Sequence, residues 1–174
     1  GFEGLLILQP RIFKDERGGF YESWNEATFK SLGLDLRFVQ DNQSISHKNV
    51  LRGLHFQHEP HAQGKLVRVT RGKALDVVVD LRKNSKTYGQ HYKVVLCSDK
   101  ANMMWVPTGF AHGFIALENN TVFQYKCDAA YNPQSEDCLI WNDPKLGIDW
   151  EIKNPIISSK DEEGKSFDNL DTAF

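Results

Sequence analysis

The segment RGLHFQHEPHAQGKLVR, from Arg52 to Arg68, is denser in polar chemistry than any other part of the chain. Its 17 residues include three histidines, three arginine or lysine residues and two glycines. Its end runs into a strand-like apolar stretch at Leu66, Val67 and Val69. Fixed positive charge and titratable imidazole groups together suit an anionic ligand. We therefore expect a binding site at the mouth of a structure built from β-sheet.

The chain on both sides of this segment consists of short strand-like runs separated by turns. One helix is predicted from Asn25 to Leu32, with Asn25 or Thr28 as its cap and Gly33 as its stop. The predicted strands are 4–8, 20–24, 37–40, 66–70, 74–81, 92–96, 103–106, 112–117 and 121–126. Residues 41–44 and 46–49 are predicted to be polar loop. Many short strands with little helix predict an all-β fold, an antiparallel sandwich or barrel.

The runs 66–70 and 74–81 are separated by a glycine-containing turn, a pattern that predicts a β-hairpin. The odd-numbered positions from Leu75 to Leu81 are apolar and share one face of the second strand. The opposite face is unusual, because Asp76 and Asp80 stand on either side of a valine.

A length of 174 residues predicts one domain spanning 1–174. The segment 132–174 is rich in proline and aspartate, and we expect it to wrap around the outside of the sheet. A net charge of −2 gives no general attraction to nucleic acid or to an anionic membrane. No apolar run could cross a bilayer, and no targeting segment opens the chain, so we expect a cytoplasmic protein. The three cysteines are odd in number and lack zinc-ligand spacing, which favours reduced thiols.

His55 is the best candidate for a general base, because it lies in an otherwise apolar run and imidazole titrates near neutral pH. A core histidine bonded to a backbone carbonyl is the alternative, and spacing alone slightly favours it. Strict alternation would place Arg52 and His55 on opposite faces of a strand. A bulge at Gly53 would bring them to the same side.

Two further residues share the parity of inward-facing neighbours. Lys65 is in phase with Val67, so it would place a fixed positive charge at the mouth of the sheet, where it could stabilise an enolate or a phosphate oxygen. A lysine that extends to solvent at a strand end is an equal alternative. Tyr125 matches Phe123 and could deliver a proton, although packing is the more common role of a strand tyrosine.

Together, His55, His58, His61 and His112 suggest a metal centre. The stretch from Pro107 to His112 fits the PxGxxH half of the metal signature of cupins, but the HxH half is missing, since two residues separate His55 from His58. We therefore interpret His112 as a non-metal site residue or a structural one.

Nine stretches in order resemble the dTDP-4-dehydrorhamnose 3,5-epimerase family, nearly from end to end. They are FKDERGGFYESWN, FVQDNQSIS, KNVLRGLHFQ, HAQGKLVRV, VVVDLRKNSKTYGQ, WVPTGFAHGF, YKCDAAYNPQSE, IWNDPKLGIDW and SSKD. The resemblance implies a cupin-type antiparallel jelly roll, a homodimer, and an isomerase that uses neither a metal nor another cofactor. Its substrate would be dTDP-4-dehydro-6-deoxyglucose, inverted at C3 and C5 in deoxysugar synthesis.

The resemblance also implies roles for individual residues. His55 would accept the proton, Asp161 would support its imidazolium, and Tyr125 would donate a proton. Lys65 would stabilise the enolate, His112 would line the sugar site, and Tyr131 would stack on thymine. The residues expected to hold the nucleotide and its diphosphate are Arg17, Glu22, Gln40, Asn42, Arg52, Glu136 and Lys160. Gly19 departs from the family, which usually has an aromatic residue there, so one wall of the nucleotide pocket is expected to be looser.

Three alternatives stay open. One is a relative that inverts only one carbon, which shares most of these residues, and another is a ketoisomerase acting on a dTDP-4-keto sugar. A cupin that binds a nucleotide sugar without catalysis belongs to a different class, and it leaves the joint presence of His55, Asp161, Lys65 and Tyr125 unexplained.

Overall fold

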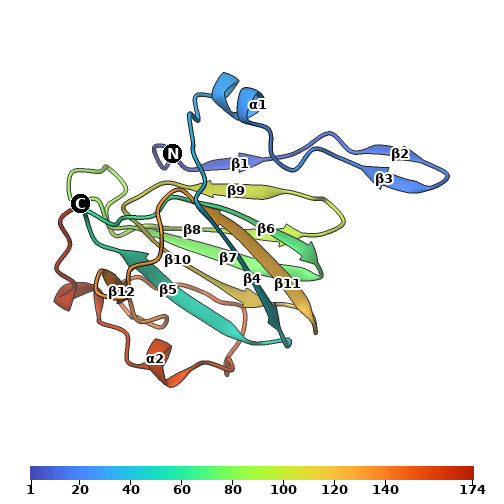
Figure 1. The fold of residues 1–174 in the computed structure, drawn as a ribbon. Coiled ribbons are helices and arrows are strands. Elements are labelled where there is room, and N and C mark those ends of the chain that lie inside the picture. The colour runs from blue at the N-terminus through green and yellow to red at the C-terminus, as the bar shows by residue number, and fades with distance from the viewer.

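Two five-stranded sheets face each other in the computed structural model, which describes residues 1–174 (Figure 1). The first sheet has the order β1 (Leu6–Leu8), β9 (Met103–Val106), β6 (Lys65–Arg71), β11 (Thr121–Cys127) and β4 (Gln40–Ser46). The second has the order β12 (Glu136–Cys138), β5 (Leu51–Gln57), β10 (Phe110–Ala116), β7 (Lys73–Asp80) and β8 (His91–Cys97). All pairings within these sheets are antiparallel, which confirms the predicted all-β sandwich.

A third, two-stranded unit extends away from the sandwich. It consists of β2 (Phe13–Asp15) and β3 (Gly18–Phe20), and Figure 1 shows it as an arm reaching beyond the sheets. The predicted strand 20–24 is wrong, because strand structure ends at Phe20. Two of the arm's aromatic side chains are largely exposed, Phe13 at 53% and Phe20 at 72%.

The predicted hairpin across residues 66–81 is wrong. The strand β6 pairs with β9 and β11 in the first sheet, whereas β7 pairs with β8 and β10 in the second. Gly72, with φ of 81°, therefore turns the chain from one sheet to the other, and a Cβ there would lie 2.7 Å from Thr121 Oγ1. A local strand-turn-strand pattern cannot distinguish the two outcomes, because both need the same turn chemistry.

The predicted loop at 41–44 and 46–49 is also wrong in its first part. The strand β4 covers Gln40–Ser46 at the edge of the first sheet and pairs only with β11. Its side chains alternate between half-buried and exposed up to the buried Ser46, as a strand requires, but almost all of them are polar. Hydrophobic periodicity was therefore not available as a signal.

The helices are short. The helix α1 (Glu26–Ser31) begins after Asn25, whose Oδ1 accepts a hydrogen bond from the Thr28 backbone N–H at 3.0 Å, and Gly33 follows it with φ of 85°. The predicted helix and its Asn25 cap are thus confirmed. The others are α2 (Ser159–Glu162) and the 3₁₀ helix η1 (Phe167–Asn169), and no helix is long and apolar enough to cross a membrane.

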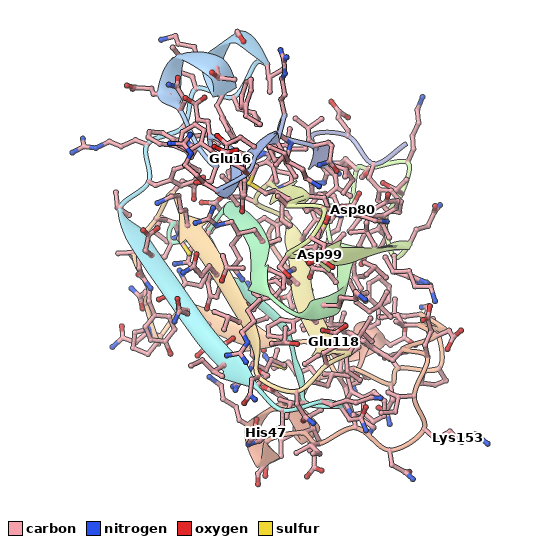
Figure 2. All side chains as sticks on the ribbon, turned by 90° about the vertical axis from the view of Figure 1, so that its right-hand side faces the viewer. Glu16, His47, Asp80, Asp99, Glu118 and Lys153 are labelled. Atoms are coloured by element: carbon pink, nitrogen blue, oxygen red, sulfur yellow. The ribbon has the colours of Figure 1, made fainter.

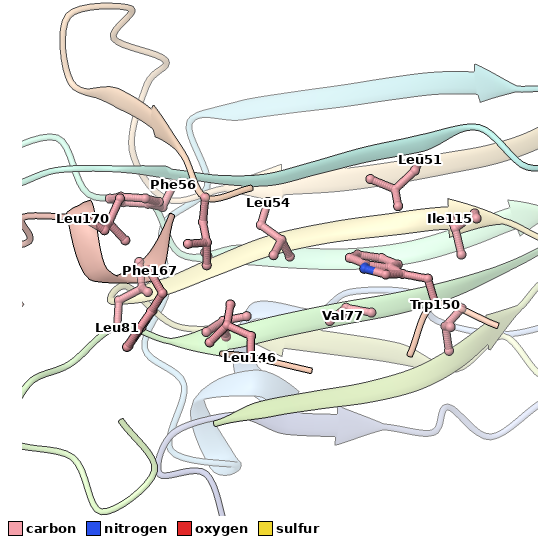
Figure 3. Packing of buried hydrophobic residues seen from close by; sticks show 14 residues of the cluster. Leu51, Leu54, Phe56, Val77, Leu81, Ile115, Leu146, Trp150, Phe167 and Leu170 are labelled. Carbon is pink, nitrogen blue, oxygen red and sulfur yellow. The ribbon is translucent and has the colours of Figure 1, made fainter. Parts of the chain in front are cut away.

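The second sheet separates the two larger of the three apolar clusters, the third being a small one of Phe29, Leu66, Met103 and Trp105. One cluster lies between the sheets and includes Val78, Phe114 and Phe123. The other lies on the outer face of the second sheet, where the segment after β12 packs Leu146, Trp150, Phe167 and Leu170 against it (Figure 3). Strand β7 contributes to both clusters, and so it is buried on both faces over nearly its whole length.

Asp80, at the end of β7, is fully buried and fixes the loop that follows it. Its carboxylate accepts two hydrogen bonds at 2.8 Å from the Arg82 guanidinium and one at 2.6 Å from each of the Ser85 and Thr87 hydroxyl groups. Burial opposes ionisation, but these donors outweigh it and lower the pKa of Asp80 to about 2.

Asp80→Asn should destabilise the protein by about 1–3 kcal/mol at neutral pH, because the amide cannot accept all of these hydrogen bonds. The lowered pKa means that the stabilisation is complete above the ordinary value of 3.8 and is lost as pH falls towards 2. Urea unfolding at pH 7 and pH 3 should therefore show a gap between wild type and variant that narrows at pH 3. Asp99→Asn, at an exposed turn with no such bonds, is the matched control (Figure 2). A constant gap would contradict this account.

Candidate active site

A pocket of about 330 Å³ opens between the two sheets. Strands β4, β5, β6, β10, β11 and β12 and the helix α2 all contribute to its lining. The sequence-predicted residues that it brings together are Arg52, His55, Lys65, His112, Tyr125, Glu136, Lys160 and Asp161. A smaller adjoining pocket of about 90 Å³ shares four of these and adds Gln40, Asn42 and Tyr131.

A bulge in β5 gives the site its shape. His112 of β10 pairs with His55, but the next paired position, Phe114, lies opposite Arg52, so β5 holds one extra residue there. Gly53 occupies the bulge with φ of 119°, and a Cβ on it would lie 2.5 Å from Gly113 Cα. Only glycine fits such a close approach. The predicted bulge is confirmed, and Arg52 and His55 line the same pocket.

His55 and Asp161 form a hydrogen-bonded pair. His55 Nε2 lies 2.7 Å from Asp161 Oδ1, and the Gly53 backbone N–H donates to Asp161 Oδ2 at 3.2 Å. Asp161 lies on α2, which Ser158 caps. Burial opposes ionisation of Asp161, but His55 and Gly53 outweigh it and hold the pKa of Asp161 below its ordinary value. The carboxylate is therefore charged at neutral pH, and it only accepts, so His55 Nε2 carries a proton and Nδ1 is left free to take one.

Lys65 lies at the start of β6 and is buried. Its Nζ donates to the His55 backbone carbonyl at 3.3 Å. Burial lowers the pKa of Lys65, while the negative charges of Glu136 and Asp76 partly oppose this. Because the effective dielectric constant is low in a buried position, the Lys65 ammonium group interacts strongly with any negative charge that develops beside it.

Tyr125 reaches the pocket from β11 of the first sheet, whereas His55 reaches it from β5 of the second. Burial raises the pKa of Tyr125 above its ordinary value, so the phenol keeps its proton at neutral pH. An acid on one sheet and a base on the other therefore face the same cavity. This arrangement can take a proton from one side of a small molecule and return one to the other side.

His112 is paired with Asp76, on the unusual polar face of β7. Its Nε2 lies 2.6 Å from Oδ1 of the fully buried Asp76. Burial raises the pKa of Asp76, although His112 partly opposes this, and the second carboxylate oxygen has no partner in the protein. A carboxylate within an otherwise apolar strand, between Leu75 and Val77, was the signal available in the sequence.

Glu136 connects the two pockets. It accepts hydrogen bonds from the Tyr131 hydroxyl at 2.7 Å and from Lys160 Nζ at 2.5 Å. Burial opposes its ionisation, but these two donors lower its pKa. Gln40 supports the same region, since its Oε1 accepts from the Tyr131 backbone N–H at 2.8 Å. The ring of Tyr131 is half exposed beside the smaller pocket.

Two predicted ligand-binding residues lie outside these pockets. Arg17 is in the turn of the β2–β3 arm, where its guanidinium pairs with Asp15 at 2.6 Å and is otherwise in solvent. Glu22 accepts hydrogen bonds from Asn25 and Thr28 near the start of α1. Within one chain, neither side chain reaches His55.

Comparison with known proteins identifies the family of this chain. The sequence matches the dTDP-4-dehydrorhamnose 3,5-epimerase family over residues 1–169. The dTDP-4-dehydrorhamnose 3,5-epimerase of Escherichia coli is 49% identical over 170 residues, which cover 97% of this chain and 92% of that protein.

Solved structures are equally similar. The dTDP-4-dehydrorhamnose 3,5-epimerase of Elizabethkingia anophelis is 47% identical with a TM-score of 0.92, covering 96% of this chain and 93% of that one. The 3,5-epimerase of Legionella pneumophila, solved in complex with dTDP-4-keto-L-rhamnose, is 45% identical with a TM-score of 0.92, covering 96% and 89%. The expected cupin-type jelly roll is thereby confirmed. The chain belongs to the dTDP-4-dehydrorhamnose 3,5-epimerase family.

Proposed function

We propose that this protein is an isomerase that inverts C3 and C5 of dTDP-4-dehydro-6-deoxyglucose, giving dTDP-4-dehydro-L-rhamnose. The observation that carries the proposal is the convergence of His55 and Tyr125 from opposite sheets on one pocket that also holds the buried Lys65. Family membership supports the same substrate class, since the Legionella relative was solved with the product of this conversion.

The chemistry follows from the ketone at C4. The hydrogens on C3 and C5 are both adjacent to the carbonyl, so removal of either leaves an enolate with its charge on the C4 oxygen. His55 accepts the proton at Nδ1, and Asp161 stabilises the imidazolium that forms. Lys65 stabilises the enolate oxygen. Tyr125 then donates a proton from the opposite face, and the carbon is inverted.

The remaining lining residues suit the nucleotide part of the substrate. Arg52 and Lys160 supply positive charge for a diphosphate, and Tyr131 offers a half-exposed ring on which thymine can stack. Gln40, Asn42 and Glu136 supply hydrogen-bonding groups beside that ring, and His112 completes the sugar site. None of these roles requires a cofactor.

Proton NMR in deuterated water tests the proposal directly. With dTDP-4-dehydro-6-deoxyglucose, the signals at both C3 and C5 should disappear as the inverted sugar forms. Loss of one signal would instead identify a monofunctional epimerase, and migration of the ketone a ketoisomerase. Binding of dTDP without any exchange would leave only a non-catalytic binding protein.

His55→Ala should reduce deuterium exchange at both carbons by about 10²–10⁴-fold, because no other group can replace the base. Binding of dTDP, measured by calorimetry, should change little. His58→Ala is the matched control, since His58 pairs with Asp137 outside the pocket and should leave exchange intact. Turnover close to wild type in His55→Ala would show that the base is misassigned.

Tyr125→Phe should impair inversion more than exchange, because the base survives and only the opposite-face donor is removed. The ratio of exchanged to inverted substrate, read from the same NMR spectra, should therefore rise. Equal loss of both would argue against a donor role for Tyr125.

We further propose that the protein acts as a homodimer in which the β2–β3 arm reaches the site of the partner. The arm presents the exposed rings of Phe13 and Phe20, which need a cover, and carries Arg17 away from its own pocket. In the partner's site, Arg17 would bind the substrate's diphosphate, with Glu22 beside the nucleotide. Gly19, in β3, has no side chain to add to that wall of the nucleotide pocket.

Mixed dimers test this arrangement. Arg17→Ala and His55→Ala chains should each be weakly active alone, whereas a refolded equal mixture should regain about a quarter of wild-type activity, because half of the dimers then hold one intact site of two. If Arg17 acts within its own chain, mixing restores nothing. Mixing His55→Ala with Lys65→Ala, two residues of the same pocket, is the control that should show no rescue.

A further inference from the structure

Cys138 lies directly behind the pair formed by His55 and Asp161. It is the last residue of β12, opposite His55 in the antiparallel ladder. One donor atom each of His55, Cys138 and Asp161 lie within 4.8 Å of one another. Cys138 is buried, and no role in proton transfer falls to it.

We propose that these three side chains form a binding site for Zn²⁺, and that the bound ion switches the base off. Imidazole, thiolate and carboxylate are the three ligand types that zinc takes in proteins. Three protein ligands leave the fourth tetrahedral position for water or a substrate oxygen.

The charges of the ligands match a dication, and the thiolate favours zinc over magnesium and calcium. An ionised Asp161 and a Cys138 thiolate together offset the two charges of the ion, so the complex is neutral in a buried position. Burial, followed by the nearby charges of Asp161 and Asp137, raises the pKa of the Cys138 thiol to about 12. Without metal the thiol is therefore protonated and unreactive, and zinc must displace that proton. Magnesium and calcium prefer oxygen ligands, so a site with one thiolate and one imidazole should bind them weakly.

The geometry requires only small side-chain movements. Donor atoms about 2.0–2.3 Å from a tetrahedral zinc lie roughly 3.3–3.8 Å apart. The 2.7 Å hydrogen bond from His55 Nε2 to Asp161 Oδ1 must open slightly, and no separation among the three donor atoms needs to close by more than about 1 Å. The ion takes the place of the proton that the pair shares.

Zinc at Nε2 reverses the function of the imidazole ring. A neutral histidine that binds metal through one nitrogen carries its proton on the other. Nδ1 would then be a donor, and it could not accept a proton from the substrate. The proposal therefore predicts reversible inhibition by a metal in an enzyme whose proposed reaction uses none.

The first test is binding, which does not depend on the proposed reaction. Competition against a chromophoric chelator should show one tight Zn²⁺ per chain, with the affinity reduced at least roughly tenfold by Cys138→Ser. Cys97→Ser, at another buried cysteine, is the matched control and should bind like wild type. His58→Ala should also bind zinc like wild type, which would show that the separate pair of His58 and Asp137 is not the site. Equal zinc affinity in wild type and Cys138→Ser, or no binding at all, would overturn the proposal.

Cobalt provides a readout on the unmodified protein, should Cys138→Ser fail to fold. Co²⁺ bound by the thiolate should produce sulfur-to-metal charge-transfer absorption, and its absence would contradict coordination by Cys138. If the chain is an active epimerase, one equivalent of Zn²⁺ should inhibit exchange in wild type and much less in Cys138→Ser, and a chelator should restore it. Loss of activity in both proteins alike would mean inhibition through another site.

Discussion

The hydrogen bond between His55 and Asp161 joins residues 106 positions apart, and much of the fold is needed to make it. His55 is set by the bulge in β5, whereas Asp161 comes from a one-turn helix near the end of the chain. The helix is held in place because the segment around it packs Trp150, Phe167 and Leu170 onto the outside of the second sheet. The outer core thus helps to position Asp161 against the proposed base, although it contributes no reactive group itself.

The polar site interrupts the inner core. Between the sheets, apolar side chains such as Val78 and Phe123 give way to Lys65, Asp76 and His112, all of them buried. Lys65 donates to the His55 backbone carbonyl, and His112 pairs with Asp76. These hydrogen bonds offset the cost of burying the three side chains. The exception is the second carboxylate oxygen of Asp76, which has no partner in the protein, whereas the first pairs with the pocket-lining His112.

How far the sequence predicts this molecule depends on the kind of signal each part carries. The helix α1 and the bulge at Gly53 were predictable, because capping and glycine chemistry are local. The strand β4 was not, because its inward side chains line a polar pocket and the apolar alternation of an ordinary strand is missing. The pairing of β6 and β7 depends on which sheet each strand joins, and no local pattern contains that information. Most of the site residues were predicted through family resemblance. Sequence spacing alone could not have predicted that Asp161 contacts His55 or that Arg17 lies outside the pocket of its own chain.

Strand β7, buried on both faces, separates two kinds of constraint at single-residue resolution. The odd-numbered Leu75, Val77 and Val79 belong to the outer core, whereas the even-numbered Ala74 and Val78 belong to the inner core. Asp76, between those two, pairs with the pocket-lining His112. Substitutions at the odd-numbered positions of this strand should therefore mainly lower the amount of folded protein. Substitution of Asp76 should mainly lower turnover. Neighbouring residues of one strand are thus constrained for different reasons, one for the stability of the fold and the next for the shape and charge of the pocket.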